Sequence, residues 1–276
     1  MSFYIIPSPI GNLDDFTIRA INTIKGLDFL VVENKSSAQK LLKKFGVTVK
    51  DIYTYNDHSN DKDRHKIIKL LTENKTGGLV SEAGTPLISD PGYKLILEII
   101  NQNIRVIPLP GPSSVITALV ASGLPTDKFQ FFGFLPKKEK DLHKTLTQCV
   151  NCEVSSIFFE SSHRIYSTLK IIEKLFGKNA NVCVAKEISK MHENFFRGSA
   201  EEIIAQFDIN EDLKKGEFII LIKLIKLDVD MTVPDTLFAQ LSHKISTKEL
   251  AKLSSDITGL NKNLLYERFL SFSKKS

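Results

Sequence analysis

The segment SEAGTPLISDPG, residues 81–92, is the most informative part of this chain of 276 residues. It follows directly on a short apolar run, Gly78 to Ser81, that predicts a β-strand, and Pro91 begins a helix predicted to end near Asn101. In open α/β sheets, ligands bind beyond the carboxyl ends of the strands, and small residues there let a ligand approach the backbone closely. The segment therefore predicts a ligand-binding loop between a strand and a helix.

Strand-like runs on both sides of this loop alternate with amphipathic helical stretches. The strands are predicted at Phe3–Ile6, Asp28–Glu33, Asp51–Thr54, Gly78–Ser81 and Arg105–Leu109. This alternation is typical of βα units and a mostly parallel sheet. Two more loops rich in Pro and Gly follow the first and fifth strands, at Pro7–Asn12 and Pro108–Ser114. We expect all three loops to gather at one edge of the sheet.

The pattern changes after Pro125, where several strands follow one another without a helix between them. This predicts a second α/β domain with a mixed sheet. Beyond Leu227, a stretch through Pro234 is interpreted as a linker, and Thr236–Phe272 predicts three short helices. The expected domains are residues 1–125, 126–227 and 228–276.

Composition excludes several classes of protein. The apolar runs, such as Phe218–Ile222, are far shorter than the roughly 20 residues of a membrane span, and no signal peptide is evident, so we expect a cytoplasmic protein without a membrane role.

Cys149 and Cys152 form a lone C-x-x-C without further metal ligands, so no metal site is predicted. None of the loops matches a dinucleotide fingerprint or a P-loop. The net charge of +5 permits a polyanionic partner.

Several long strings, in one order, carry a resemblance to a known family. They are PSPIGNLDDFTIRAI, SEAGTPLISDPGYKLI, VIPLPGPSSVITALVASGLPTD, FFGFLPKK and FFESSHR. Together they closely resemble the bacterial 16S rRNA 2'-O-methyltransferase I family, ribosomal RNA small subunit methyltransferase I, of the tetrapyrrole methylase superfamily. The resemblance implies a two-domain α/β fold of the class III methyltransferases with a small C-terminal helical appendage. It also implies a homodimer.

The resemblance further implies that S-adenosylmethionine binds between the two α/β domains and that a cytidine 2'-hydroxyl in the decoding region of 16S rRNA is methylated. Cofactor-binding positions carried over from the family are Pro9, Ala83, Gly84, Thr85, Ile88, the turn Leu119-Val120, and Phe159-Glu160. A sulfonium leaves without an acid, so the enzyme must mainly align the methyl group and help to remove the hydroxyl proton.

Polar residues at predicted strand ends are candidates for the base. Glu33 and Asp57 are preferred over His58 and Glu187. Two departures from the family lie beside them: Glu33-Asn34-Lys35-Ser36 stands where the family usually has Glu-Asp-Thr-Arg, and Asn56-Asp57-His58 where it often has His-Asp-His. A forked guanidinium is thereby replaced by a hydroxyl, which affects the expected RNA side of the site.

Basic residues suggest how 16S rRNA or the small ribosomal subunit is held. They are Lys137, Lys138, Lys140, His143, Lys144, His163 and Arg164, and in the tail Lys244, Lys248, Lys252, Lys262, Arg268, Lys274 and Lys275. Two other functions remain open at this point. One is a methyltransferase of the same fold that acts on a tetrapyrrole or a protein side chain, and the other is a non-catalytic RNA-binding paralogue.

Overall fold

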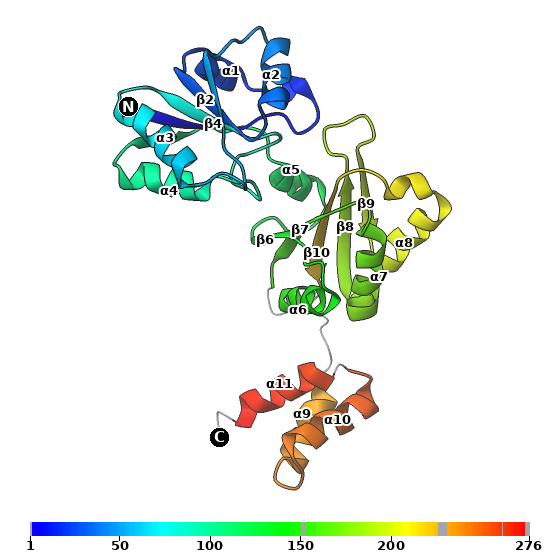
Figure 1. Ribbon diagram of the computed structural model, residues 1–276. Helices are drawn as coiled ribbons and strands as arrows, with labels where there is room; N and C mark the ends of the chain where they lie inside the picture. The colour runs from blue at the N-terminus through cyan, green and yellow to red at the C-terminus, as the bar shows by residue number, and fades with distance from the viewer. Residues whose placement is uncertain (1, 151–152, 226–230, 261, 274–276) are drawn as a thin grey trace. The chain divides into compact units, whose positions relative to one another are not determined.

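The computed structural model describes residues 2–150, 153–225, 231–260 and 262–273 (Figure 1). The chain forms two compact units, residues 1–225 and 226–276. Cys152, Lys274 and Lys275 lie outside the described residues. Within the residues that are described, no helix is long and apolar enough to cross a membrane.

The first sheet is parallel throughout, as the βα alternation predicts. Within the described residues it has five strands in the order β3-β2-β4-β1-β5. The strands are β1 (Ser2–Ile6), β2 (Phe29–Val32), β3 (Asp51–Thr54), β4 (Gly77–Val80) and β5 (Arg105–Pro108). Each predicted strand of this part is confirmed, with ends that differ by one or two residues.

Helices cover both faces of this sheet (Figure 1). On one face, α1 (Ile18–Lys25) and α2 (Lys35–Lys44) pack against Leu30 and Val32. On the other face, α3 (Asp61–Thr72) and α4 (Tyr93–Asn101) pack against Val31. Alternate residues of β2 thus enter opposite cores, because successive side chains of a strand point to opposite faces. A strand buried on both faces explains the continuous apolar run.

The strand order places a crevice between β1 and β4. From β1 the chain crosses to β2 on one side of the sheet, and from β4 it crosses over β1 to β5 on the other side. The loops that follow these two adjacent parallel strands therefore leave in opposite directions. Ligands of open α/β sheets bind at such a switch point. The loops concerned are Pro7–Asn12 and residues 81–92.

The second sheet is mixed, as predicted. Its five described strands have the order β6-β7-β10-β8-β9, with β6 and β7 parallel and the remaining neighbours antiparallel. The strands are β6 (Phe129–Phe134), β7 (Ser155–Glu160), β8 (Ala180–Lys186), β9 (Asn194–Gly198) and β10 (Phe218–Leu224). One face packs against α6 (Glu139–Val150), α7 (Ile165–Phe176) and α8 (Ala200–Ile209).

The other face of the second sheet is covered by α5 (Ser114–Ala121), a helix that the sequence analysis did not predict. Leu119 and Val120 lie inside this helix, so the expected turn at these positions is wrong. The apolar run after Ser113 continues as a helix and turns only at Ser122-Gly123, where Gly123 adopts a positive φ. Helix α5 precedes residue 126, yet it packs on the second sheet. The domain boundary near residue 126 stays a prediction.

The second compact unit is helical in its described residues. It contains α9 (Thr232–Leu241), α10 (Thr247–Thr258) and α11 (Lys262–Ser273), which pack around Leu250, Ala251, Leu265 and Phe269. The three predicted helices are confirmed, but the first begins earlier than expected. Pro234, interpreted as linker, lies in the first turn of α9, where a missing N–H leaves no helical hydrogen bond unmade.

Candidate functional site

Three loops at the carboxyl ends of β1, β4 and β5 are joined by main-chain and hydroxyl hydrogen bonds. Ser8 and Gly84 exchange two backbone hydrogen bonds, with N···O distances of 2.9 and 3.0 Å. The Thr85 hydroxyl donates to the carbonyl of Pro112 at 2.9 Å. Gly84 has a φ of +75°, which a residue with a side chain adopts only with strain. The expectation that the three loops gather at one edge is confirmed.

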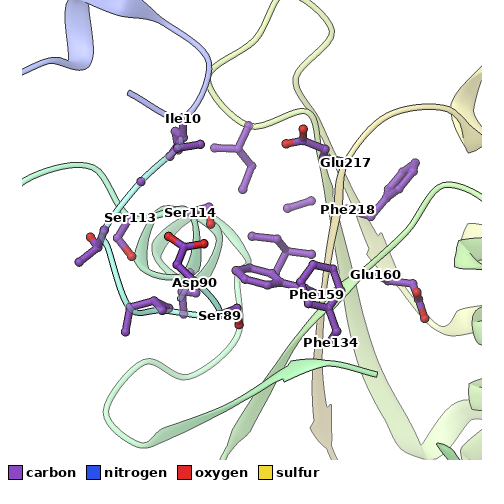
Figure 2. Close-up of a pocket in the computed structure, with 18 residues that line it drawn as sticks. Ile10, Ser89, Asp90, Ser113, Ser114, Phe134, Phe159, Glu160, Glu217 and Phe218 are labelled. Carbon is purple, nitrogen blue, oxygen red and sulfur yellow. The ribbon is translucent and has the colours of Figure 1, made fainter. Parts of the chain in front are cut away.

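A cavity of about 230 Å³ lies between these loops and the second sheet (Figure 2). We call the side formed by the three loops and the start of α5 the loop wall. It consists of Ile10, Ala83, Gly84, Thr85, Ile88, Ser89, Asp90, Ser113, Ser114 and Val115. The opposite side, on or next to strands of the second sheet, is the strand wall. It consists of Phe134, Phe159, Glu160, Ala185, Ile188, Glu217, Phe218 and Ile219.

Most of the predicted cofactor-binding residues line this cavity. Those that do are Ala83, Gly84, Thr85, Ile88, Phe159 and Glu160. Pro9 is buried next to the lining residue Ile10, and Leu119 is buried against the second sheet. Val120 is exposed on α5. None of these three is among the lining residues, so their part in cofactor binding stays a prediction.

Other lining residues escaped the sequence analysis for different reasons. Ser113 and Ser114 stand at the end of the loop after β5, so the rule that ligands bind beyond strand ends is enough to place them. Ala185 and Ile219 enter the cavity because β8 and β10 pair antiparallel and place them opposite each other. A single sequence carries no signal for that pairing.

The Glu160 side chain in the strand wall is held by hydrogen bonds inside the fold. Its side chain is only 1% exposed, and its carboxylate accepts hydrogen bonds from Thr168 at 2.7 Å and from Arg164 at 3.1 Å. The Arg164 guanidinium also donates to the carbonyls of Leu135 and Pro136, at 3.0 and 2.9 Å. The strings FFGFLPKK and FFESSHR are thus held together by one arginine. Arg164, expected to contact phosphate, has its described hydrogen bonds inside the fold.

Carboxyl groups converge where β2 and β4 end. Burial raises the pKa of Glu33, and the charges of Glu82 and Asp57 raise it further, against a backbone hydrogen bond from Glu82 that lowers it. Burial, followed by the charge of Glu33, raises the pKa of Asp90 to about 7, although a hydrogen bond from Ser81 lowers it. Of these four carboxyl groups, only that of Asp90 belongs to a residue that lines the cavity.

The remaining candidate bases lie in other surroundings. Asp57 and His58 are exposed in the loop after β3. Glu187 accepts hydrogen bonds from the Glu217 backbone at 2.9 Å and from Lys190 at 3.0 Å. Burial acts to raise the pKa of Glu187, and the two hydrogen bonds act to lower it. On balance the pKa of Glu187 is lowered. A carboxylate held in its charged form by two donors is a weak proton acceptor.

The two departures from the family pattern have local structural roles. The Asn34 side chain caps α2 by accepting from the backbone of Ser36 and Ser37, at 2.9 and 3.3 Å. Asn56 donates from its side chain to the carbonyl of Glu33 at 3.4 Å. Both asparagines therefore fix the backbone around Glu33 and add no charge there.

Phe134 is an exposed aromatic residue of the strand wall. The pairing of β6 with β7 shifts register between Phe131 and Phe134, and Gly133 in this bulge has a φ of +69°. Bulges next to active sites redirect side chains. The Phe134 ring contacts that of Phe159 edge-on at 5.3 Å between centroids, yet Phe134 is 64% exposed.

Comparison with known proteins agrees with this architecture. Residues 2–204 match the family described as Tetrapyrrole (Corrin/Porphyrin) Methylases. Ribosomal RNA small subunit methyltransferase I of Rickettsia prowazekii is 44% identical over 79% of this chain and 77% of its own length. The protein of that name from Escherichia coli O157:H7 is 36% identical over 96% of this chain and 93% of its own length.

Solved structures with little sequence similarity share the fold. A diphthine synthase matches with a TM-score of 0.62 at 12% identity, over 82% of this chain and 90% of its own. A cobalt precorrin-4 methyltransferase matches with a TM-score of 0.56 at 16% identity, over 80% of this chain and 94% of its own. At such low identity these structures establish the two-sheet α/β fold alone.

Proposed function

This chain belongs to the ribosomal RNA small subunit methyltransferase I family, within the tetrapyrrole methylases, and from that premise we propose that it methylates a ribose 2'-hydroxyl of 16S rRNA. As a member of a methylase family, the protein is a methyltransferase. In finer detail, the donor is S-adenosylmethionine and the acceptor is a cytidine of the decoding region. The small ribosomal subunit in the cytoplasm supplies that cytidine.

The charge of the cavity carries the proposal. The lining residues include the acids Asp90, Glu160 and Glu217, and among the described residues that line it there is no lysine or arginine. Arg164 and Lys190, which pair with Glu160 and Glu217, stand outside the lining, and Asp90 has no described cationic partner. A sulfonium carries a positive charge, which acidic groups attract and basic groups would repel. Apolar side chains such as Ile10, Ile88 and Phe159 fit the uncharged parts of a nucleoside. The residues present therefore fit S-adenosylmethionine.

When bound, S-adenosylmethionine supplies an electrophilic methyl group. The loop wall would hold this group through its backbone, which the hydrogen bonds of Ser8 with Gly84 and of Thr85 with Pro112 keep in place. The strand wall closes the other side, so the geometry of approach is fixed before the acceptor arrives. A carboxylate at the carboxyl ends of the strands then takes the hydroxyl proton. The sequence predicts Glu33 or Asp57 for this role.

An RNA acceptor is supported by basic and aromatic side chains. Lys137, Lys138, Lys140 and Lys144 are exposed around the start of α6, and Lys244, Lys248, Lys252 and Lys262 are exposed in the helical unit. Such groups bind phosphates. Arg268 differs, because it forms a bidentate pair with Asp235 at 2.7 and 2.6 Å. Phe134 offers an exposed ring, on which an unstacked base can lie.

A homodimer belongs to the same proposal. Tyr93, Leu97 and Ile100 follow each other at helical spacing along α4 and are 71%, 43% and 53% exposed. An apolar stripe of this kind is typical of a protein interface. Light scattering of the purified protein measures the mass of the particle, and a monomeric mass contradicts the dimer.

Two measurements test the function. Calorimetric titration with S-adenosylmethionine should give binding, and its absence favours a non-catalytic RNA-binding protein. Incubation with small ribosomal subunits that lack the modification should then produce 2'-O-methylcytidine, identified by nucleoside mass spectrometry. Methylation of a tetrapyrrole or of a protein side chain, with none on the subunits, contradicts the proposed acceptor.

A further inference from the structure

Asp90 occupies an unusual position among the carboxyl groups of the site. It lies at the end of the loop after β4, and its side chain projects from the loop wall toward the cavity, while Phe159 enters from the strand wall (Figure 2). Ala83, Gly84, Thr85 and Ile88, which the family resemblance assigns to the cofactor, belong to the same loop and line the same cavity. The Asp90 carboxyl group is therefore next to the place expected for the methyl donor.

The backbone that carries Asp90 is strained. Leu87 and Ser89 have φ values of +75° and +65°, a region that residues with side chains seldom adopt. Such conformations persist when the surrounding structure imposes them, and they concentrate at functional sites. Both strained residues lie within three positions of Asp90.

The charged groups around Asp90 come from both walls. Glu33, after β2, and Glu82, in its own loop, both act on Asp90 by repulsion. Across the cavity, Glu160 is paired with Arg164, and Glu217 is paired with Lys190 at 3.0 Å. Asp90 is thus the cavity-lining acid without a described cationic partner. Burial and repulsion both favour its protonated form, which raises the pKa of Asp90 to about 7.

We propose that Asp90 is the group that accepts the proton of the attacking hydroxyl, and that Glu33 is a positioning residue that acts through it. The inference rests on the proposed methyl transfer. As the acceptor oxygen forms its bond to the methyl carbon, the carbon–sulfur bond breaks and its electron pair stays on sulfur, which becomes a neutral thioether. The hydroxyl proton passes to the Asp90 carboxylate, so charge and atoms balance. A base with a pKa near the working pH suits this transfer.

Asp90→Asn and Glu33→Gln separate the two roles. With unmodified small subunits, Asp90→Asn should lower kcat by a factor of about 10² to 10⁴. Calorimetric binding of S-adenosylhomocysteine and the affinity for the subunits should both change less than about threefold, which shows that the variant is folded. Glu33→Gln should keep transfer, and the midpoint of its kcat–pH profile should lie below that of the wild type, because a repelling charge is gone. Glu73→Gln, on the exposed C-terminal end of α3, is the control.

The outcomes distinguish this inference from the function on which it rests. Absence of transfer by the wild type overturns the proposed function and the inference with it. If the wild type is active and Asp90→Asn retains kcat, or if Glu33→Gln binds S-adenosylhomocysteine normally but loses all transfer at every pH, the inference alone is wrong. A ¹³C titration of the carboxyl groups gives a readout independent of activity. The signal missing in Asp90→Asn should titrate near pH 7 in the wild type, and a midpoint below 5 overturns the inference.

Discussion

The two walls of the cavity are built by different means. The loop wall depends on backbone conformation: Gly84 adopts a positive φ, and main-chain groups of Ser8 and Gly84 bind each other. The strand wall depends on side chains: Phe134 and Phe159 contact each other, and Arg164 holds Glu160 in the interior. A substitution that disturbs the backbone of the loop wall should therefore change ligand binding more than stability. A substitution in the strand wall should affect stability or the acceptor.

The largest effect is expected where a buried charge loses its partner. Arg164→Met should lower the free energy of unfolding by about 3 kcal/mol, because the Glu160 carboxylate stays buried without its cation. Urea unfolding measures the change. The double variant Glu160→Gln with Arg164→Met should recover about half of the loss. Lys170→Met removes the more exposed pair of Lys170 with Glu173 in α7, the helix that Arg164 precedes, and should change stability by less than about 0.5 kcal/mol. If Arg164→Met lowers the free energy of unfolding by as little as Lys170→Met does, the account of the strand wall is wrong.

The aromatic residue of the strand wall should affect the acceptor next most strongly. Phe134→Ala should weaken the apparent affinity for the small subunit roughly thirtyfold, about 2 kcal/mol, if a base stacks on the ring. Binding of S-adenosylhomocysteine should change little. Phe129→Ala is the matched control, since Phe129 lies on the same strand and is 43% exposed but does not line the cavity. Equal effects of the two variants contradict stacking at Phe134.

Adding one methyl group at Gly84 tests the role of the loop wall. In Gly84→Ala a Cβ is placed at a φ of +75° and 3.2 Å from a methyl carbon of Ile10. The affinity for S-adenosylhomocysteine should fall about tenfold, about 1.4 kcal/mol, as the loop shifts. Gly46→Ala has a similar φ of +62° with no atom near the added Cβ, and it should leave this affinity unchanged. Calorimetry that gives equal affinities for both variants rejects the backbone account of the loop wall.

The smallest effect links stability to pH. The pKa of Asp90 is raised from 3.8 to about 7 in the folded protein, so the folded state holds this proton more tightly than the unfolded chain. The contribution of Asp90 to stability therefore falls as pH rises from about 4 to about 7 and stays low above that range. After allowance for solvent screening, Asp90→Asn should be on the order of 1 kcal/mol more stable than the wild type at pH 8. The difference in stability between Asp90→Asn and the wild type should shrink at pH 5. Thermal unfolding at pH 5 and pH 8 measures it, and an equal difference at the two pH values contradicts the prediction.

The sequence by itself determined the local elements and the ligand edge. Apolar runs separated by helical periods gave the five parallel strands, and Pro/Gly loops at strand ends located Ala83, Gly84 and Thr85. These features depend on neighbouring residues, so a single chain displays them. Helix α5 was missed because its residues are mostly apolar, and a short apolar run next to a Pro/Gly loop has no amphipathic period to recognise.

Only the tertiary structure decided what faces these loops. The antiparallel pairing of β8 with β10 brings Ala185 and Ile219, which are 34 positions apart in the chain, to the same cavity. The same holds for Asp90, whose sequence neighbours do not reveal that Glu33, from a different strand end, lies close enough to repel it. Burial and charge are set by groups far apart along the chain. The pattern of residues therefore located the ligand edge, and the packing of two sheets distinguished one carboxyl group from the others.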